Sequence, residues 1–324
     1  MLRLRRLNGL VKNVGNPLEV TQILFVTLSN IGDVILTTPT LEALHQQFPN
    51  AVIDIVCDQR SAIIFQYYPY LGKLIYKEKQ AGWKSLFKLV SVLREKKYDV
   101  AVDLRTDGLL HFVRAKTKVF KLSNCKTIKM HSAEKHYAVL KNLVNVPIPS
   151  AKIWLSEKEV RSADEALKAH AQQRVLGIGI GANFTGKIWP ASSFAMLANA
   201  LKPFFDVVLI FGDKNDASLS EAFKSKCHLP TIDFCGQLNL LETAAYLRKA
   251  HFFIGNDSGL GHIASALALP TFTVFGVGQP ARYLPWSNKA MWYQDPQFEI
   301  KNVDPMNIAA MLIPALSPSL ASTR

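Results

Sequence analysis

Cysteine is scarce in the sequence, and the common metal-binding motifs are missing. The 324 residues include four cysteines, and no two of them form a CxxC pair. Neither an HExxH motif nor an Asp-x-Asp pair occurs. A disulfide framework and a metal site are therefore disfavoured. We expect free thiols at Cys57, Cys125, Cys227 and Cys235, no metal ion and no cofactor.

Long apolar segments are also missing. No run approaches the roughly 18 apolar residues that a membrane-spanning helix needs. Residues 1–20 are basic but lack the continuous apolar core of a signal peptide, so we interpret them as an N-terminal extension of a cytoplasmic protein. The composition, 49% hydrophobic and 19% charged, is typical of a folded globular chain.

Two familiar nucleotide-binding signatures are absent. No GxxxxGK[ST] loop occurs, and Gly177, Gly179 and Gly181 do not complete a GxGxxG pattern, which disfavours a nicotinamide dehydrogenase. The sequence also contains no recognisable nucleic-acid-binding module, which disfavours a nucleic-acid partner.

Basic residues are concentrated in the first half of the sequence. Residues 1–150 hold 22 of the 38 Lys and Arg residues but only 11 of the 25 acidic residues. This excess indicates an anionic partner: nucleic acid, an anionic membrane surface or a phosphorylated substrate. The alternative is a solvated basic surface that aids solubility.

Short apolar runs alternate with helical patterns along the chain. Seven runs are rich in β-branched and aromatic residues, as are strands buried on both faces of a parallel sheet. We predict strands at Ile23–Leu28, Val52–Cys57, Val100–Leu104, Val175–Ile180, Val207–Phe211, His251–Ile254 and Thr271–Phe275.

The segment at residues 146–158 contains two prolines and divides these runs into two series. We predict an α/β protein with two doubly wound, Rossmann-like domains, at residues 21–155 and 156–324. Ligands bind at the carboxyl ends of the strands in such sheets, so the site is expected in the cleft between the domains.

A helical period runs through residues 83–97, where Trp83, Leu86, Phe87, Val90 and Leu93 share one face. We favour a helix that buries this face against the sheet, because the strand–helix pattern requires a covering helix here. The alternative is a helix at a membrane surface, since lysines occupy other faces.

Polar residues follow several of the predicted strands. In SNIGD, residues 29–33, Asp33 comes where a strand ends and a helix begins, and it is either a helix N-cap or a catalytic carboxylate. In GANFTGKIWP, residues 181–190, Lys187 precedes a helix and is either a phosphate ligand or a surface lysine. Asp216 follows a strand, as a ribose ligand or as a solvated residue at a helix start.

The run from residue 252 to 276 contains a glycine-rich turn between a strand and an apolar helix. Ser258, Gly259 and Leu260 can offer first-turn amides to a phosphate oxygen. His262 lies one turn further along and is either an anion ligand or a structural histidine, while Asp257 is a candidate helix cap.

Together these runs resemble the heptosyltransferases of glycosyltransferase family 9, which build the inner core of bacterial lipopolysaccharide. The resemblance extends from about residue 22 to 290, and IGDVILTTP is most similar to the branch that adds heptose III. It is carried by SNIGDVILTTP at 29–39, YDVAVDLRTDG at 98–108, HSAEKHYAVL at 131–140, GANFTGKIWP at 181–190 and GNDSGLGHIASAL at 255–267.

The resemblance implies a GT-B fold whose first domain binds the acceptor and whose second binds ADP-L-glycero-D-manno-heptose. It further implies inverting transfer without a metal, with Asp33 as general base. The implied donor ligands are Lys187, Asp216, Asp257, Ser258, Gly259, Leu260 and His262. Asp216 stands where the family tends to carry a glutamate, and the loop before Lys187 lacks the threonine-arginine pairing seen in some members.

The implied acceptor is a lipid A-core molecule at the anionic inner-membrane surface. We predict acceptor contacts from Arg105, Arg114 and Lys116, and attraction of Arg3, Arg5 and Arg6 to anionic lipid. Two alternatives stay open from the sequence: a transferase of the same fold that uses another nucleotide sugar, and a non-catalytic nucleotide- or nucleic-acid-binding protein.

Overall fold

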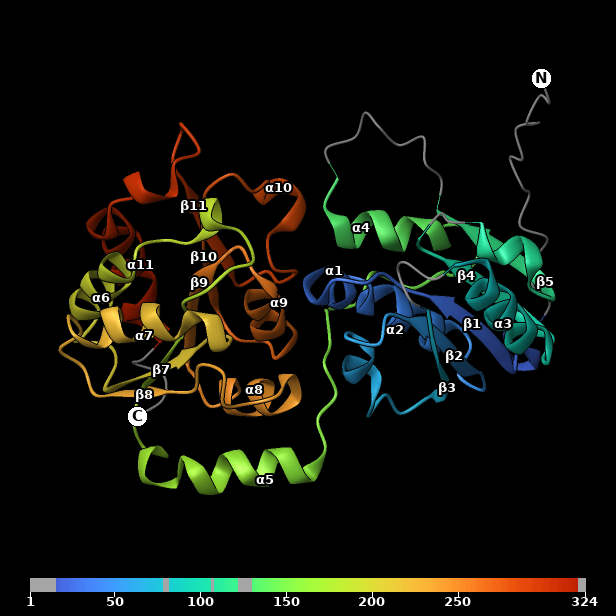
Figure 1. Ribbon diagram of the computed structural model, residues 1–324, viewed down its shortest axis with the longest axis horizontal. Helices are drawn as coiled ribbons and strands as arrows, with labels where there is room; N and C mark the ends of the chain where they lie inside the picture. Colours follow the sequence, from blue (N-terminus) through green and yellow to red (C-terminus); the bar gives the residue numbers. More distant parts are fainter. Residues whose placement is uncertain (1–15, 78–81, 106–107, 122–129, 320–324) are drawn as a thin grey trace.

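The computed structural model describes residues 16–77, 82–105, 108–121 and 130–319. Arg3, Arg5, Arg6 and Cys125 lie outside these residues. The chain forms two α/β domains side by side, each around its own parallel sheet (Figure 1). The first domain is blue to green in the figure, and the second is green to red.

The first sheet has five parallel strands in the order β3-β2-β1-β4-β5. Its central strand β1 is buried and pairs with β2 and β4, so that Ile23 lies opposite both Ile53 and Val100. The strands are β1 Gln22–Val26, β2 Val52–Cys57, β3 Leu71–Tyr76, β4 Tyr98–Asp103 and β5 Ala115–Phe120. The helices are α1 Ile31–Ile35, α2 Thr38–Gln47, α3 Trp83–Arg94 and α4 Ser132–Tyr137.

The second sheet has six parallel strands in the order β11-β10-β9-β6-β7-β8. The strands are β6 Val175–Gly179, β7 Val207–Phe211, β8 Thr231–Asp233, β9 Phe252–Asn256, β10 Thr271–Phe275 and β11 Ala290–Gln294. The helices are α5 Glu157–Ala166, α6 Ala191–Ala200, α7 Ala217–Lys224, α8 Leu240–Leu247, α9 Gly259–Ala266, α10 Pro280–Tyr283 and α11 Pro305–Ser319. Residues 141–156 carry neither helix nor strand and join the two domains. Ser156, the N-cap of α5, is the proposed start of the second domain.

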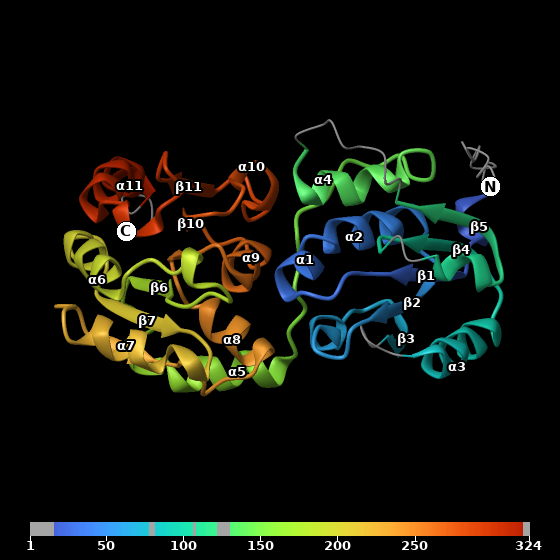
Figure 2. The same ribbon diagram turned by 45° about the horizontal axis from the view of Figure 1, so that its top comes forward.

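Three clusters of buried apolar side chains hold the layers together. One cluster packs α6, α7 and α11 on one face of the second sheet, and another packs α3 on one face of the first sheet. The third is shared, because it runs from α2 and the first sheet to α8, α9 and the second sheet. The two domains are therefore in apolar contact, and Figure 2 shows α1 and α9 side by side at their junction.

All seven predicted strands are present, with ends that differ by at most two residues. The sequence reading missed β3, β5, β8 and β11, which are the four edge strands of the two sheets. Most of their side chains are exposed or only half-buried, so they lack a continuous apolar run.

The prediction of which face is buried in the helix at residues 83–97 is wrong in part. The helix does cover the sheet, but the fully buried side chains are Leu89 and Leu93. Trp83 is 77% exposed and Phe87 is 70% exposed. The buried face is therefore rotated relative to the predicted one, and two aromatic rings of the predicted face lie in solvent.

Candidate active site

Asp33 lies in the first turn of α1, immediately after the central strand of the first sheet. The N-cap of this helix is Asn30, and no side chain makes a capping hydrogen bond there. Instead, Nδ2 of Asn30 donates to Oδ2 of Asp33 over 3.0 Å. The carboxylate therefore is not a helix cap. It is held by a single side-chain amide at the carboxyl edge of the sheet.

Helix α1 meets α9 of the second domain at a pair of glycines. A Cβ atom on Gly32 would lie 2.8 Å from Cδ2 of His262, and a Cβ atom on Gly259 would lie 3.3 Å from Cγ2 of Ile31. A side chain at Gly32 would therefore force the imidazole to move, and one at Gly259 would fit only tightly, so glycine lets the two helix starts approach this closely. The contact brings the loop that carries Asp33 against the loop predicted to bind the donor.

His262 lies within this contact and is only 5% exposed. Burial lowers its pKa to about 4, so the imidazole is neutral at physiological pH. Its Nδ1 has no hydrogen-bonding partner among the described residues. The side chain thus packs against Gly32 as a structural histidine would, while it keeps one unused polar atom near the site.

The N-terminus of α9 carries unused hydrogen-bonding groups. Ser258 is the N-cap, but its hydroxyl makes no capping bond and is buried without a partner among the described residues. The amides of Gly259 and Leu260 belong to the first turn, where a helix supplies no acceptor. Asp257 is not the cap of this helix. These groups form a cradle suited to an anion.

Lys187 and Asp257 form an ion pair, with Nζ 2.6 Å from Oδ2. The lysine side chain is 27% exposed, whereas the aspartate is 7% exposed. Lys187 ends a short 3₁₀ turn that follows β6, and Asp257 follows β9, the neighbouring strand. The structure therefore brings these two predicted donor residues together and fixes the ammonium beside the start of α9.

Asn256 ties the two loops to each other, a role that the sequence reading missed. Its side chain is fully buried; Oδ1 accepts from the amide of Trp189 at 2.9 Å, and Nδ2 donates to the carbonyl of Ile180 at 2.8 Å. The indole of Trp189 is also fully buried and donates to the carbonyl of Val303. The only sign of this link in the sequence is an asparagine directly before an aspartate at the end of a predicted strand.

Asp216 lies beneath the start of the β6 loop. Its Oδ2 accepts from the amide of Asp213, and burial raises its pKa. A Cβ atom on Gly181 would lie 2.0 Å from the same oxygen. Asp216 is therefore a buried residue of a capping turn, not a solvated one, and it lies next to the loop that carries Lys187.

The three predicted acceptor residues lie at different edges of the first sheet. Arg105 follows β4 at the carboxyl edge, and its guanidinium hydrogen-bonds to Oγ of Ser29 in the loop of Asp33. Arg114 and Lys116 lie at the amino end of β5, where Lys116 pairs with Asp99 at 2.7 Å. A six-residue strand spans about 20 Å, so the structure does not bring Arg114 and Lys116 together with Asp33.

A basic cluster that the sequence reading missed lies around Asp33. Lys121 follows the carboxyl end of β5, and its Nζ is 3.4 Å from Nδ1 of His136. Burial lowers the pKa of Lys121, and Lys135 and Arg282 act in the same direction, while Asp33 opposes them. Because β5 was not predicted, nothing in the sequence marked Lys121 as a cleft residue.

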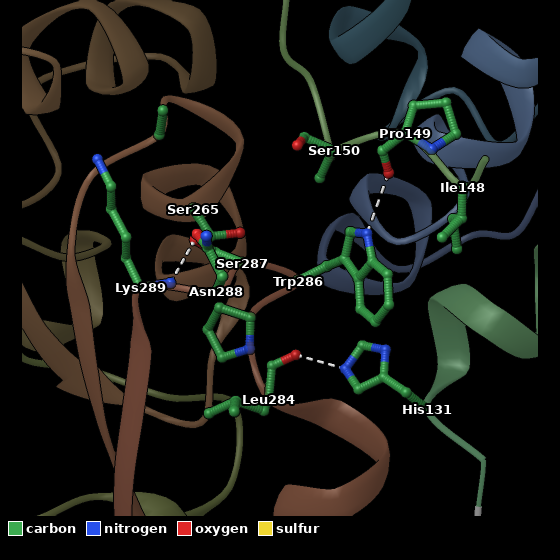
Figure 3. Close-up of a pocket in the computed structure, with 13 residues that line it drawn as sticks. His131, Ile148, Pro149, Ser150, Ser265, Leu284, Trp286, Ser287, Asn288 and Lys289 are labelled. Carbon is green, nitrogen blue, oxygen red and sulfur yellow. Dashed lines mark hydrogen bonds between the residues drawn. The ribbon is translucent and has the colours of Figure 1, made fainter.

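Further contacts between the domains lie beside the joining segment at residues 141–156, here called the hinge (Figure 3). Nε2 of His131 donates to the carbonyl of Leu284 at 2.7 Å, and Nε1 of Trp286 donates to the carbonyl of Pro149 at 3.1 Å. A cavity of ≈ 530 Å³ lies here, lined by these residues and by Ser265, and not at Asp33. The cavity therefore belongs to the hinge rather than to the candidate active site.

The described residues contain neither a candidate metal site nor a candidate membrane span. No group of three or more His, Cys, Asp or Glu side chains could hold a metal ion within that part of the chain. No helix in the same residues is both long and apolar enough to cross a bilayer.

Comparison with known proteins finds relatives among the heptosyltransferases. The family model for glycosyltransferase family 9 (heptosyltransferase) matches residues 108–307. Lipopolysaccharide heptosyltransferase 3 of Escherichia coli is 26% identical over 294 residues, which covers 81% of this chain and 85% of the relative.

Solved structures of the same kind share the fold. A family 9 glycosyltransferase from Veillonella parvula superposes with a TM-score of 0.80 at 22% identity, covering 93% of this chain and 99% of that one. The ADP-heptose lipopolysaccharide heptosyltransferase II of E. coli gives a TM-score of 0.75 at 20% identity, covering 92% and 99%. Both share the two-domain GT-B arrangement described above.

Proposed function

The chain belongs to glycosyltransferase family 9 and is a glycosyltransferase, and from this premise we propose that it transfers a heptose to the inner core of lipopolysaccharide. We take the donor to be ADP-L-glycero-D-manno-heptose and the reaction to be inverting and metal-independent. The functions of the relatives support the proposal, since one is a lipopolysaccharide heptosyltransferase and another is an ADP-heptose enzyme.

The observation that carries the proposal is the contact of α1 with α9 at Gly32 and Gly259. It joins a carboxylate of the first domain to an anion cradle of the second. An acceptor on the first domain and a nucleotide sugar on the second would therefore meet at Asp33, which suits a transfer between two bound substrates.

In the proposed reaction, an acceptor hydroxyl oxygen attacks the anomeric carbon of the heptose. The bond from that carbon to the diphosphate oxygen breaks on the opposite face, and ADP leaves with the bonding electrons. Asp33 accepts the hydroxyl proton as the new bond forms. The amide of Asn30, 3.0 Å away, orients the carboxylate for this role.

The leaving diphosphate gains negative charge that the protein must stabilise. Lys187 supplies a charged donor, and Ser258, Gly259 and Leu260 supply a hydroxyl and two amides at the start of α9. Asp257 positions Lys187 through the 2.6 Å ion pair. These groups offer a metal-free way to meet the charge, and Asp216 is the proposed contact on the ribose side.

The proposed acceptor, a phosphorylated core sugar linked to lipid A, is anionic, and cations near Asp33 can match its charge. Arg105, Lys121 and Lys135 approach from the first domain, and Arg282 approaches from the second. We assign these four residues to the acceptor, and His262 packs against Gly32 in the interdomain contact. The protein would then act in the cytoplasm, at the inner-membrane surface that holds its lipid-linked acceptor.

The proposed function is tested by assaying purified protein with ADP-heptose and a core acceptor that lacks the added heptose, in the presence of EDTA. We expect one heptose to be added per ADP released, with the opposite anomeric configuration to the donor. UDP-hexose and ADP-hexose serve as control donors. Preference for a control donor, or activity lost in EDTA and restored by Mg²⁺, would contradict the proposal.

A further inference from the structure

Helix α3 covers the first sheet with one face and exposes large aromatic side chains on another. Leu89 and Leu93 are buried in the cluster that α3 shares with the sheet. Trp83 and Phe87 are separated by one helical turn, so they share a face, and they are 77% and 70% exposed. They are the two most exposed large hydrophobic side chains among the described residues, and a contiguous exposed apolar patch of this kind indicates a binding face.

The charges on this helix are all of one sign. Lys84 and Lys88 are exposed and lie one turn apart on the face next to the aromatic rings. Arg94 adds a third positive charge, and the sequence of α3 contains no acidic residue. The helix therefore combines exposed aromatic rings with lysines beside them. This combination suits a surface whose anionic groups cover an apolar layer, as in a lipid bilayer.

The second domain does not cover helix α3. Figures 1 and 2 show the helix on the outer side of the first domain, away from the second domain. Helix α3 follows β3 and runs back towards the start of β4, so its first turn lies nearer the carboxyl edge of the sheet. Asp33 lies at the same edge, after β1.

We propose that the Trp83–Phe87 face of α3 docks the protein onto the surface of an anionic lipid bilayer. The two rings enter the boundary between headgroups and acyl chains, and Lys84 and Lys88 contact the lipid phosphates. This inference rests on the proposed function, because a lipid-linked acceptor would be presented at the same edge. A second copy of the chain fits less well, since the two α3 helices would bring like charges together.

The experiment measures binding of the full-length protein, without donor or acceptor, to vesicles of phosphatidylcholine with and without phosphatidylglycerol. We expect binding to the anionic vesicles only. Trp83→Ala/Phe87→Ala should weaken it by at least about tenfold, because both rings lose their burial in the interface. Lys84→Gln/Lys88→Gln should weaken it by roughly fivefold per lysine.

Matched variants of the second domain control for the loss of an exposed aromatic ring or of exposed lysines elsewhere on the protein. Trp292→Ala removes an aromatic side chain that is 44% exposed, and Lys202→Gln/Lys301→Gln removes two exposed cations. These should bind anionic vesicles as the wild type does. Brominated lipids should quench part of the tryptophan fluorescence of the wild type and of Trp292→Ala, and less of it in Trp83→Ala/Phe87→Ala.

Three outcomes would overturn the proposal: wild-type affinity in the α3 variants, an equal loss in the controls, or a lipid-free dimer that only the aromatic α3 variant abolishes. Turnover with a detergent-dispersed acceptor separates this inference from the proposed function. Trp83→Ala/Phe87→Ala should retain that turnover while losing vesicle binding. A wild-type protein that binds vesicles but transfers no heptose would instead refute the function and leave the docking face intact.

Discussion

At the scale of single residues, the position of a side chain along its strand decides whether it lies at the same edge of the sheet as Asp33. Arg114 and Lys116 are as basic as Lys121, but they lie at the amino end of β5 and Lys121 lies just beyond its carboxyl end. This difference in position could not be predicted, because β5 is half-exposed and lacks the apolar run of a buried strand. Asp33, Lys187 and Ser258 follow strands that were predicted, and the structure brings their loops together.

Lys187 provides a direct test of the anion cradle. Lys187→Ala should weaken ADP binding by about 1.5–3 kcal/mol, the contribution of a charge-assisted hydrogen bond. Isothermal titration calorimetry measures this, with Lys202→Ala as a control for the loss of an exposed lysine elsewhere in the second domain. Unchanged ADP affinity in Lys187→Ala would remove the lysine from the diphosphate site.

At the scale of elements, buried strands can be predicted and edge strands cannot. The seven predicted strands are the interior strands of the two sheets. These strands are covered on both faces, so their sequences are continuous apolar runs. The four missed strands are all edges, whose half-exposed residues carry no such run. Helix α3 shows the same limit, because its apolar residues outnumber those that the sheet can cover, and periodicity alone does not say which ones remain exposed.

The site depends on the contact between helices α1 and α9. A substitution at Gly32 tests this contact. Gly32→Ala should destabilise the protein by about 1–3 kcal/mol, because the added methyl group would lie 2.8 Å from Cδ2 of His262. Chemical denaturation monitored at both domains measures the change.

The partner in that contact supplies the control. In a His262→Ala background the same glycine substitution should cost much less, since the clashing ring is gone, and the two effects should not be additive. Additive effects would show that Gly32 and His262 do not form the contact in solution.

At the scale of the whole molecule, the sequence predicted two Rossmann-like domains but not how they meet. The shared apolar cluster and the hinge hydrogen bonds of His131 and Trp286 join residues far apart in the chain, and no local pattern encodes such pairs. The resemblance to family 9 supplied the expectation that Asp33 faces the donor loop. The basic excess of the first half is spread over the cleft, the far edge of β5 and α3, so net charge alone could not locate an acceptor site.

The central claim is that the base on one domain acts on a sugar held by the other, and the most direct test is a paired measurement on Asp33→Asn. We predict that turnover falls by roughly 10²–10⁴, because the proton acceptor is lost. ADP affinity, measured by calorimetry on the same protein, should stay close to that of the wild type, because the proposed nucleotide site lies in the second domain. Wild-type turnover in Asp33→Asn, or a loss of ADP affinity that accounts for the whole effect, would contradict the claim.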